Sequence, residues 1–413
     1  MFARLRWIGL TLLIAASGRA EVTYQDWEQA PHSYFQKTPH DRFTKIKARL
    51  ESGTAGLDRS SERACLLSLL GLLEIPVSSQ MLVFSTTSLQ LSRIGPSTPR
   101  ALYFSDDISL GFVPGGRIEI VALDSELGGV FYIFDLPRGS GLLTVERSTR
   151  CMNCHAGEDT GYVPGLSIRS VLPGEEGGSL NSFRSGLSGH GIPLADRFGG
   201  WYITDAIGFT NHWGNRIGAQ REGRQIWIPA LATERVNFQK YATSGSALLP
   251  QLVHEHQVGL VNRVVEAHYR ARTHFFTDKT GITLEHQKEL EEQAKGLVRY
   301  LLFTDEVPLP QGVSFRDDTF KTDFAKSRRV VEGFSLRDFD LETRLFRFRC
   351  SYMIYSPVFS GLPPVMKSLV LAKLSAALKE GGTDPESAHL PPSEKRVIRK
   401  ILRMTLDGWP SEE

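Results

Sequence analysis

The sequence is poor in sulfur and lacks a long apolar segment. Only four cysteines and six methionines occur in 413 residues. No stretch reaches the roughly 18 uninterrupted apolar residues that a membrane-spanning helix needs. Internal repeats and low-complexity stretches are also missing, which excludes repeat arrays and fibrous proteins. The chain is therefore expected to form compact domains, without a membrane span in its mature form.

Charge of one sign is not in excess. The formal net charge is +2, with 41% hydrophobic and 23% charged residues, the composition of an ordinary globular protein. Loss of the three N-terminal arginines with a leader would bring the charge to −1. This balance offers no electrostatic reason to expect binding to nucleic acid or to an anionic membrane.

The N-terminus has the pattern of an export signal. Arg4 and Arg6 precede an apolar run over 7–16, and small residues surround Ala20. A charged segment, a short apolar segment and a small-residue cleavage point together predict a secretory signal peptide over 1–20. An uncleaved anchor and a buried first helix are the alternatives. We therefore expect a periplasmic or otherwise secreted protein.

The most informative motif is CMNCH at 151–155. Cys151 and Cys154, followed directly by His155, form the attachment signature of a c-type haem. The two thiols would bond the vinyl groups on one edge of the porphyrin, and His155 would become the proximal iron ligand. A zinc knuckle would need a second Cys/His pair at ligand spacing, which is missing, and a redox dithiol leaves His155 unexplained. The motif predicts one haem c per chain.

Secondary-structure patterns favour an α+β protein. Residues 21–75 are expected to be helical, and short β-branched or aromatic runs at 81–84, 101–104, 118–121 and 130–134 predict antiparallel strands. A glycine-rich segment over 157–218 is expected to wrap the haem, and helices are expected at about 226–272, 284–304, 364–379 and 393–405. The expected division is a signal peptide (1–20), an N-terminal α+β region (21–148) and a mainly helical haem-binding region (149–413), and the last two could form one integrated domain.

The second axial ligand of the iron has several candidates. Methionine has weak support, because each methionine after the motif lies among apolar neighbours. The histidines that follow the motif are His190, His212, His254, His256, His268 and His274. Helical periodicity over 251–270 places His254 and His268 within the apolar arc and His256 at its edge. A core histidine bonded to a backbone carbonyl is the alternative for each.

Other polar residues near the motif have candidate roles. Arg150, Arg169 and Arg197 could bind the haem propionates, because arginine offers a planar fork to a carboxylate. Solvent-exposed surface arginine is the alternative. Asp106-Asp107 follows an apolar run and could act in proton transfer or bind a cation, whereas a turn or a helix cap is the more ordinary role.

Several stretches together resemble one family: uncharacterised bacterial secreted proteins with a cytochrome c domain. Beside CMNCH, the similar stretches are 76–85 (PVSSQMLVFS), 87–90 (TSLQ), 99–104 (PRALYF) with Asp106-Asp107, 163–165 (VPG), 169–171 (RSV), 197–204 (RFGGWYIT), 212–215 (HWGN), 255–257 (EHQ) with Asn262, and 350–356 (CSYMIYS). The resemblance covers nearly the whole mature chain. It implies a secreted monohaem protein without an established activity.

The resemblance changes the ranking of the distal candidates. The resemblance implies that family members also carry histidine at the positions of His190, His212 and His256. At the position of His254 they carry an apolar residue. The resemblance therefore favours His256 or His212 as the distal ligand.

Electron transfer is the expected function, and a haem enzyme is the alternative. An electron carrier would have both axial positions filled and would exchange one electron with a redox partner protein. A haem enzyme would keep an open distal site for peroxide or another small-molecule oxidant. Neither the sequence nor the resemblance decides whether the protein is an enzyme, and the sequence leaves open whether Cys65 and Cys350 pair.

Overall fold

The computed structural model describes residues 22–136, 141–183, 188–222, 224–229, 236–279, 281–316 and 318–410. An antiparallel sheet forms most of the N-terminal half and helices form most of the C-terminal half, so the predicted α+β class is confirmed. The predicted signal peptide over 1–20 lies outside the described residues. The division at residue 148 stays a prediction.

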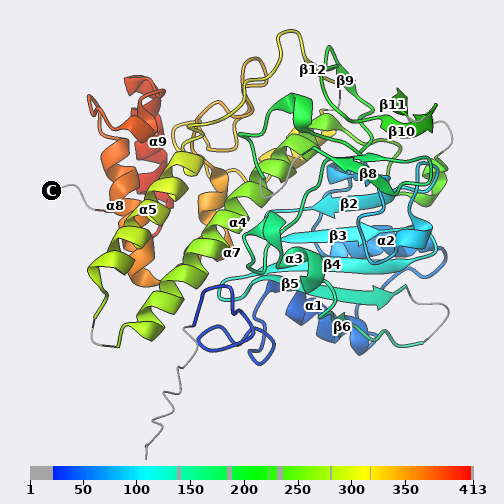
Figure 1. Cartoon of the computed structure of the whole chain (residues 1–413), viewed down its shortest axis with the longest axis horizontal. Helices are drawn as coiled ribbons and strands as arrows, with labels where there is room; N and C mark the ends of the chain where they lie inside the picture. Colours follow the sequence, from blue (N-terminus) through cyan, green and yellow to red (C-terminus); the bar gives the residue numbers. More distant parts are fainter. Residues whose placement is uncertain are drawn as a thin grey trace, which may run out of the picture.

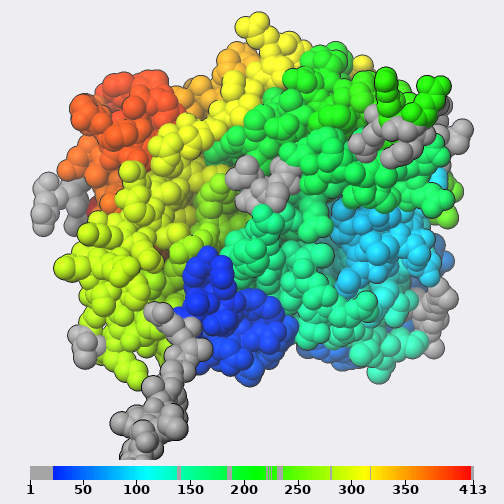
Figure 2. Space-filling view, viewed as in Figure 1, coloured from blue at the N-terminus to red at the C-terminus, as the bar shows by residue number. Residues whose placement is uncertain are grey.

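Two helices in the N-terminal region begin at side-chain caps. Asp41 accepts hydrogen bonds from two backbone amides at the start of α1 (Arg42–Glu51), and Ser61 accepts one at the start of α2 (Glu62–Leu72). The prediction of helix before Asp41 was wrong, because residues 22–41 form turns. This turn segment packs beside the sheet, where the Tyr34 hydroxyl donates to the Gly129 carbonyl over 2.6 Å. Figure 2 shows it in blue against its neighbours.

The sheet has six strands in sequence order, and all neighbours are antiparallel. The strands are β1 (Met81–Val83), β2 (Arg100–Phe104), β3 (Ile108–Phe112), β4 (Arg117–Asp124), β5 (Gly128–Asp135) and β6 (Glu146–Arg147). Four of them match the predicted runs. β3 was missed, because Gly111 interrupts its apolar pattern.

The two faces of the sheet have different environments. Alternate residues such as Tyr103, Leu110 and Phe134 are buried with α1 and α2 in one hydrophobic cluster. The other face is only half-buried at Leu102, Ser109 and Val121. Figure 1 shows α1 and α2 behind the sheet, and α3 (Met152–His155) in front of it. The half-buried face is therefore the one that receives the CMNCH motif.

The glycine-rich segment is not structureless. It contains β7 (Val171–Pro173), β8 (Ser179–Ser182) and β9 (Ala206–Ile207) as well as β10 (Arg216–Arg221). β10 pairs with β11 (Arg224–Pro229) in a hairpin, so the helix predicted from 226 was wrong at its start. The helix α4 begins at Leu248 and continues to Thr277.

The C-terminal half packs around α4. The helices are α5 (Leu284–Leu301), α6 (Thr319–Ala325), α7 (Pro357–Ser360), α8 (Pro364–Ala377) and α9 (Pro392–Thr405). Three of them, α5, α8 and α9, match predicted helices. Figure 1 shows α4 lying between the sheet on one side and α5, α8 and α9 on the other. Among the described residues, none of the helices is both long enough and apolar enough to span a bilayer.

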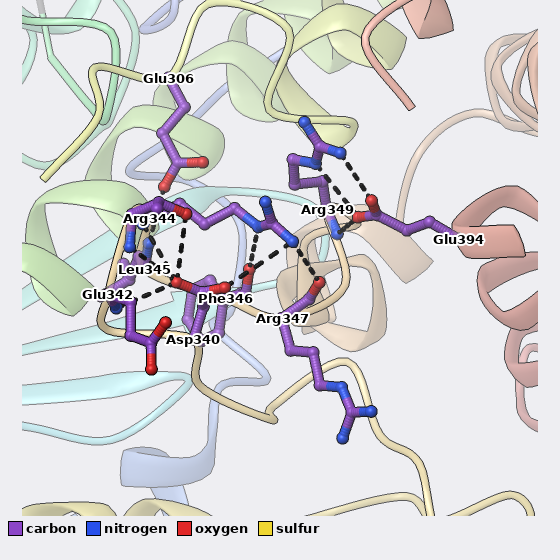
Figure 3. Close-up of polar contacts among 10 residues, drawn as sticks. Glu306, Asp340, Glu342, Arg344, Leu345, Phe346, Arg347, Arg349 and Glu394 are labelled. Carbon is purple, nitrogen blue, oxygen red and sulfur yellow. Dashed lines mark hydrogen bonds and ion pairs between the residues drawn. The ribbon is translucent and has the colours of Figure 1, made fainter. Parts of the chain in front are cut away.

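An irregular segment between α5 and α7 is held by side chains that bind backbone groups (Figure 3). Asp340 Oδ1 accepts from the Thr343 amide over 2.8 Å, and the half-buried Glu306 accepts from the Leu345 amide over 3.0 Å. The Arg349 guanidinium donates two hydrogen bonds to Glu394 at the start of α9, 3.1 and 2.6 Å long, and the Arg349 amide donates a third over 2.7 Å. These contacts hold the segment that leads to Cys350 in place and join it to the start of α9.

Candidate functional site

A cavity of about 460 Å³ lies on the half-buried face of the sheet. This volume is within the range of about 300–1,000 Å³ that is typical of ligand and cofactor sites. Its walls include Thr86, Thr87, Ser88, Leu89, Leu91, Arg100, Leu102, Ser109, Gly111, Glu119, Val121, Phe131, Arg150, Cys151, Asn153, Cys154, His155, Leu166, Arg169, His254 and Val258. The whole CMNCH motif apart from the buried Met152 therefore lines one cavity. A larger surface cavity of about 840 Å³ beside α2 contains none of the predicted site residues.

The motif forms the single helical turn α3. The Cys154 and His155 amides both donate to the Cys151 carbonyl, over 3.2 and 3.0 Å. Residues spaced by three and four positions share one side of a helix, so both thiols and the imidazole face the cavity. Met152 points away from the cavity and is buried in the hydrophobic cluster that also contains residues of α1 and α2. Burial of Met152 thus anchors the turn that presents the three reactive side chains.

The orientation of His155 is set by a backbone carbonyl. Its Nδ1 lies 3.1 Å from the Gly165 oxygen. A carbonyl can only accept, so Nδ1 carries the proton and Nε2 keeps a free lone pair. The Phe131 ring packs 4.4 Å from the imidazole, centroid to centroid. Burial lowers the pKa of His155 to about 4, which keeps the ring neutral at physiological pH.

The Gly165 carbonyl is in turn positioned by α4. Asn262 Oδ1 accepts from the Leu166 amide, and Asn262 Nδ2 donates to the Leu166 carbonyl, each over 2.8 Å. A Cβ atom at Gly165 would lie 2.5 Å from Asn262 Oδ1, so the close approach requires glycine. Asn262 therefore connects α4 with the residue that orients His155.

His254 stands on another wall of the same cavity. It projects from α4, one turn before Val258, and its ring packs 4.7 Å from that of Phe104. Its Nδ1 is buried and makes no hydrogen bond to any described residue. Burial lowers the pKa of His254 to about 4, although the Gln257 side chain and the Glu255 carboxylate act in the opposite direction. His254 is therefore a neutral imidazole with an unsatisfied nitrogen beside the cavity.

The register of the sheet places one phenylalanine beside each of these two histidines. Phe104, Ser109, Val121 and Phe131 are direct neighbours on four consecutive strands, β2 to β5. The two phenylalanines stand at the ends of this row. Each packs on one histidine ring, while the two middle residues are small and line the cavity. The row shapes a slot with an imidazole towards each end.

Charged residues also line this cavity. The Arg100 Nη1 lies 2.8 Å from Glu119 Oε2, and Ser88 Oγ donates to Glu119 Oε1 over 2.8 Å. Burial acts to raise the pKa of Glu119, but Arg100 and the hydrogen bonds outweigh it and lower the pKa. Arg150 and Arg169 line the cavity from more exposed positions, and Arg169 Nε lies 2.7 Å from Asp159 Oδ2. Arg100 and Glu119 were not among the predicted site residues, because neither stands near the motif in sequence.

The histidines favoured by the resemblance do not line the cavity. Both ring nitrogens of His256 have hydrogen-bond partners: Nδ1 lies 2.8 Å from His190 Nδ1, and Nε2 lies 2.7 Å from Ser351 Oγ. His212 stacks on Phe209 and its Nε2 lies 3.2 Å from the carbonyl of the same residue. Helical periodicity, which placed His254 within the apolar arc, was the better guide to the cavity wall.

Arg197 does not line the cavity either. Its side chain is only 4% exposed, and its Nη1 lies 3.3 Å from Glu255 Oε2. Its Nε donates to the Ile192 carbonyl and its Nη2 to the His190 carbonyl, each over 2.7 Å. The guanidinium of Arg197 thus holds the preceding loop against α4. The candidate role of Arg197 as a propionate ligand is therefore not supported.

The remaining thiols are separate. Cys65 and Cys350 are both free and buried, on α2 and beside α7. Among the described residues, no three His, Cys, Asp or Glu side chains are grouped to share one metal ion, so Cys151, Cys154 and His155 are not arranged as a zinc site.

Comparison with known proteins adds no assignment: no family model, curated protein or solved structure matches this chain.

Proposed function

We propose that the cavity binds one haem c, attached through thioether bonds to Cys151 and Cys154 and coordinated by His155. The observation that carries the proposal is the slot with the CMNCH turn in one wall and His254 in another. The residues fit the group. Nε2 of His155 has a free lone pair, both thiols line the slot, and the unsatisfied nitrogen of His254 indicates a missing polar partner.

The chain prepares its own residues for this ligand. Low pKa values keep His155 and His254 neutral at physiological pH, and only a neutral imidazole can coordinate a metal. The Gly165 carbonyl fixes the tautomer of His155 and increases its basicity as a ligand. Bound haem would supply a one-electron couple at the iron.

We propose His254 as the second axial ligand, in place of His256 or His212. It is the histidine on α4 that reaches the cavity, whereas both nitrogens of His256 are already hydrogen-bonded. With both axial positions filled, the protein would act in electron transfer with a redox partner protein. Arg150 and Arg169, at more exposed positions on the wall, are the candidates to bind the propionates.

The predicted export signal and the haem c proposal agree on location, because c-type haem is attached outside the cytoplasmic membrane. We therefore keep the proposal of a periplasmic or secreted protein. A haem enzyme acting on a small oxidant is the alternative function. It requires that His254 does not coordinate the iron, so that one coordination position stays free for the oxidant.

The absorption spectrum of the holoprotein tests this assignment. The wild type is expected to be low spin in the oxidised form and, once reduced, to remain unchanged by carbon monoxide. His254→Ala is expected to become high spin and to bind carbon monoxide. His256→Ala is the matched control on the same helix and should keep the wild-type spectrum. Carbon monoxide binding by the wild type would favour the enzyme, and a changed spectrum in His256→Ala alone would restore His256 as the ligand.

A further inference from the structure

Three neighbouring spaces with shared wall residues lie between the surface and the slot between Phe104 and Phe131. An outer cavity of about 550 Å³ lies between α1 and α6 and is lined by Arg42, Ser105, Asp106, Asp107 and Gln257 among others. A second space of about 10 Å³, close to the volume of one water molecule, shares four of these residues, Ser105, Asp106, Asp107 and Gln257. The small space also shares Ser109, Val121 and Leu166 with the cavity that contains the CMNCH motif.

Asp107 stands where the outer cavity meets the small space. Its carboxylate is 22% exposed and lies 3.0 Å from Arg42 Nη2, while Ser105 Oγ lies 3.3 Å away. Burial raises the pKa of Asp107 above its ordinary value, and the neighbouring Asp106 adds to the shift while Arg42 opposes it. Asp106 itself is 42% exposed and is paired with Arg337. The two adjacent carboxylates therefore differ in burial and in their cation partners.

Other charged groups line the outer cavity and the slot on either side of Asp107. The outer cavity is also lined by Glu74, Asp323, Lys326 and Arg337. On the inner side, Glu119 is held in its ionised form by Arg100. Asp107 is thus the acid whose burial favours protonation and which also borders the small space. It precedes Ser109 by two residues, about 7 Å along strand β3, and Ser109 lines the slot.

We propose that Asp107 takes up a proton from water in the outer cavity when the haem is reduced. This inference rests on the proposed haem c. For each electron that a one-electron donor would supply to the bound haem, the Asp107 carboxylate would gain one proton, so the added negative charge near the slot would be balanced. Oxidation reverses both transfers, and no other bond changes. The protein would then be a proton-coupled electron carrier, rather than a carrier of electrons alone.

Redox titration of the holoprotein tests this proposal. The midpoint potential of the wild type would be measured from about pH 4, near the ordinary pKa of aspartate, to about pH 8. Because the reduced form binds the proton more tightly, the midpoint potential should fall as pH rises. The steepest slope expected for one proton per electron is about 59 mV per pH unit. Asp107→Asn should remove this slope, and Asp106→Asn should keep it.

Arg42→Gln provides a second variant in case Asp107→Asn folds poorly. Loss of the guanidinium that stabilises the ionised carboxylate should move the sloping region to higher pH, with the slope retained. A potential that is independent of pH in the wild type, or a slope that is unchanged in Asp107→Asn, would overturn the proposal. Both results can be obtained only with bound haem. If the haem assignment itself fails, no covalent haem is present to titrate, so the two failures are distinguishable.

Discussion

Replacement of Asn262 by leucine should weaken both the fold and the orientation of His155. The variant loses two buried hydrogen bonds to Leu166, each 2.8 Å long, and leaves one amide and one carbonyl without these partners. A net hydrogen bond contributes about 1 kcal/mol, and an unsatisfied buried group costs about 1–3 kcal/mol. With two groups left unsatisfied, we therefore expect the free energy of unfolding to fall by about 2–6 kcal/mol. Release of Leu166 should also loosen the adjacent Gly165 carbonyl, which accepts from His155 Nδ1.

Urea unfolding and redox titration at neutral pH would measure the two effects in Asn262→Leu. A weaker hydrogen bond to His155 makes the imidazole a poorer donor to iron, so the midpoint potential should rise. Asn215→Leu is the matched control, because Asn215 holds Ile203 by the same pair of 2.8 Å bonds and Ile203 does not line the cavity. It should lose at least as much stability and keep the potential. An unchanged potential in Asn262→Leu, or an equal change in both variants, would refute the reasoning.

Three further predictions follow from the site. In the double variant Cys151→Ser and Cys154→Ser, no haem should be retained on denaturing electrophoresis, and full retention of haem would contradict this. Proteolysis of the glycine-rich segment should also increase, because the half-buried sheet face loses its cover. In that haem-free variant, stability should decrease from pH 7 to pH 5, because His155 and His254 have pKa values of about 4 in the fold and near 6.5 in the unfolded chain, which therefore binds more protons. Each imidazole should lower the free energy of unfolding by about 2 kcal/mol between pH 7 and pH 5, and equal urea midpoints at the two pH values would contradict the burial of these imidazoles. Gly165→Ala should lower the thermal midpoint, because its Cβ would meet Asn262 Oδ1 at 2.5 Å.

The sequence predicted the elements whose signals are local. Apolar runs bounded by turn residues located β1, β2, β4 and β5, and the helical pattern of the C-terminal part located α5, α8 and α9. β3 was missed because Gly111 and Ser109 weaken its pattern, yet these small residues leave room for the slot. The helix predicted over 226–272 was wrong at its start, because the β10–β11 hairpin depends on pairing between strands rather than on one segment, whereas α4 occupies its later part.

The site was predicted where its residues are consecutive. CMNCH needs only one helical turn to bring its thiols and imidazole to one side, so spacing is sufficient. The partners of the motif come from distant segments: Gly165 from a loop, His254 from α4 and Arg100 from β2. Their proximity depends on strand register and on how α4 crosses the sheet, which single-sequence patterns do not contain. Arg197 is close to the motif in sequence but is paired with Glu255 elsewhere in the fold.

Intact mass spectrometry of the mature protein, produced in cells that attach c-type haem, tests the central claim most directly. The expected result is a mass increase of one haem, which peptide mapping should locate on the fragment that contains Cys151 and Cys154. The mass of the polypeptide alone, with two thiols at these positions that react with an alkylating agent, would contradict it.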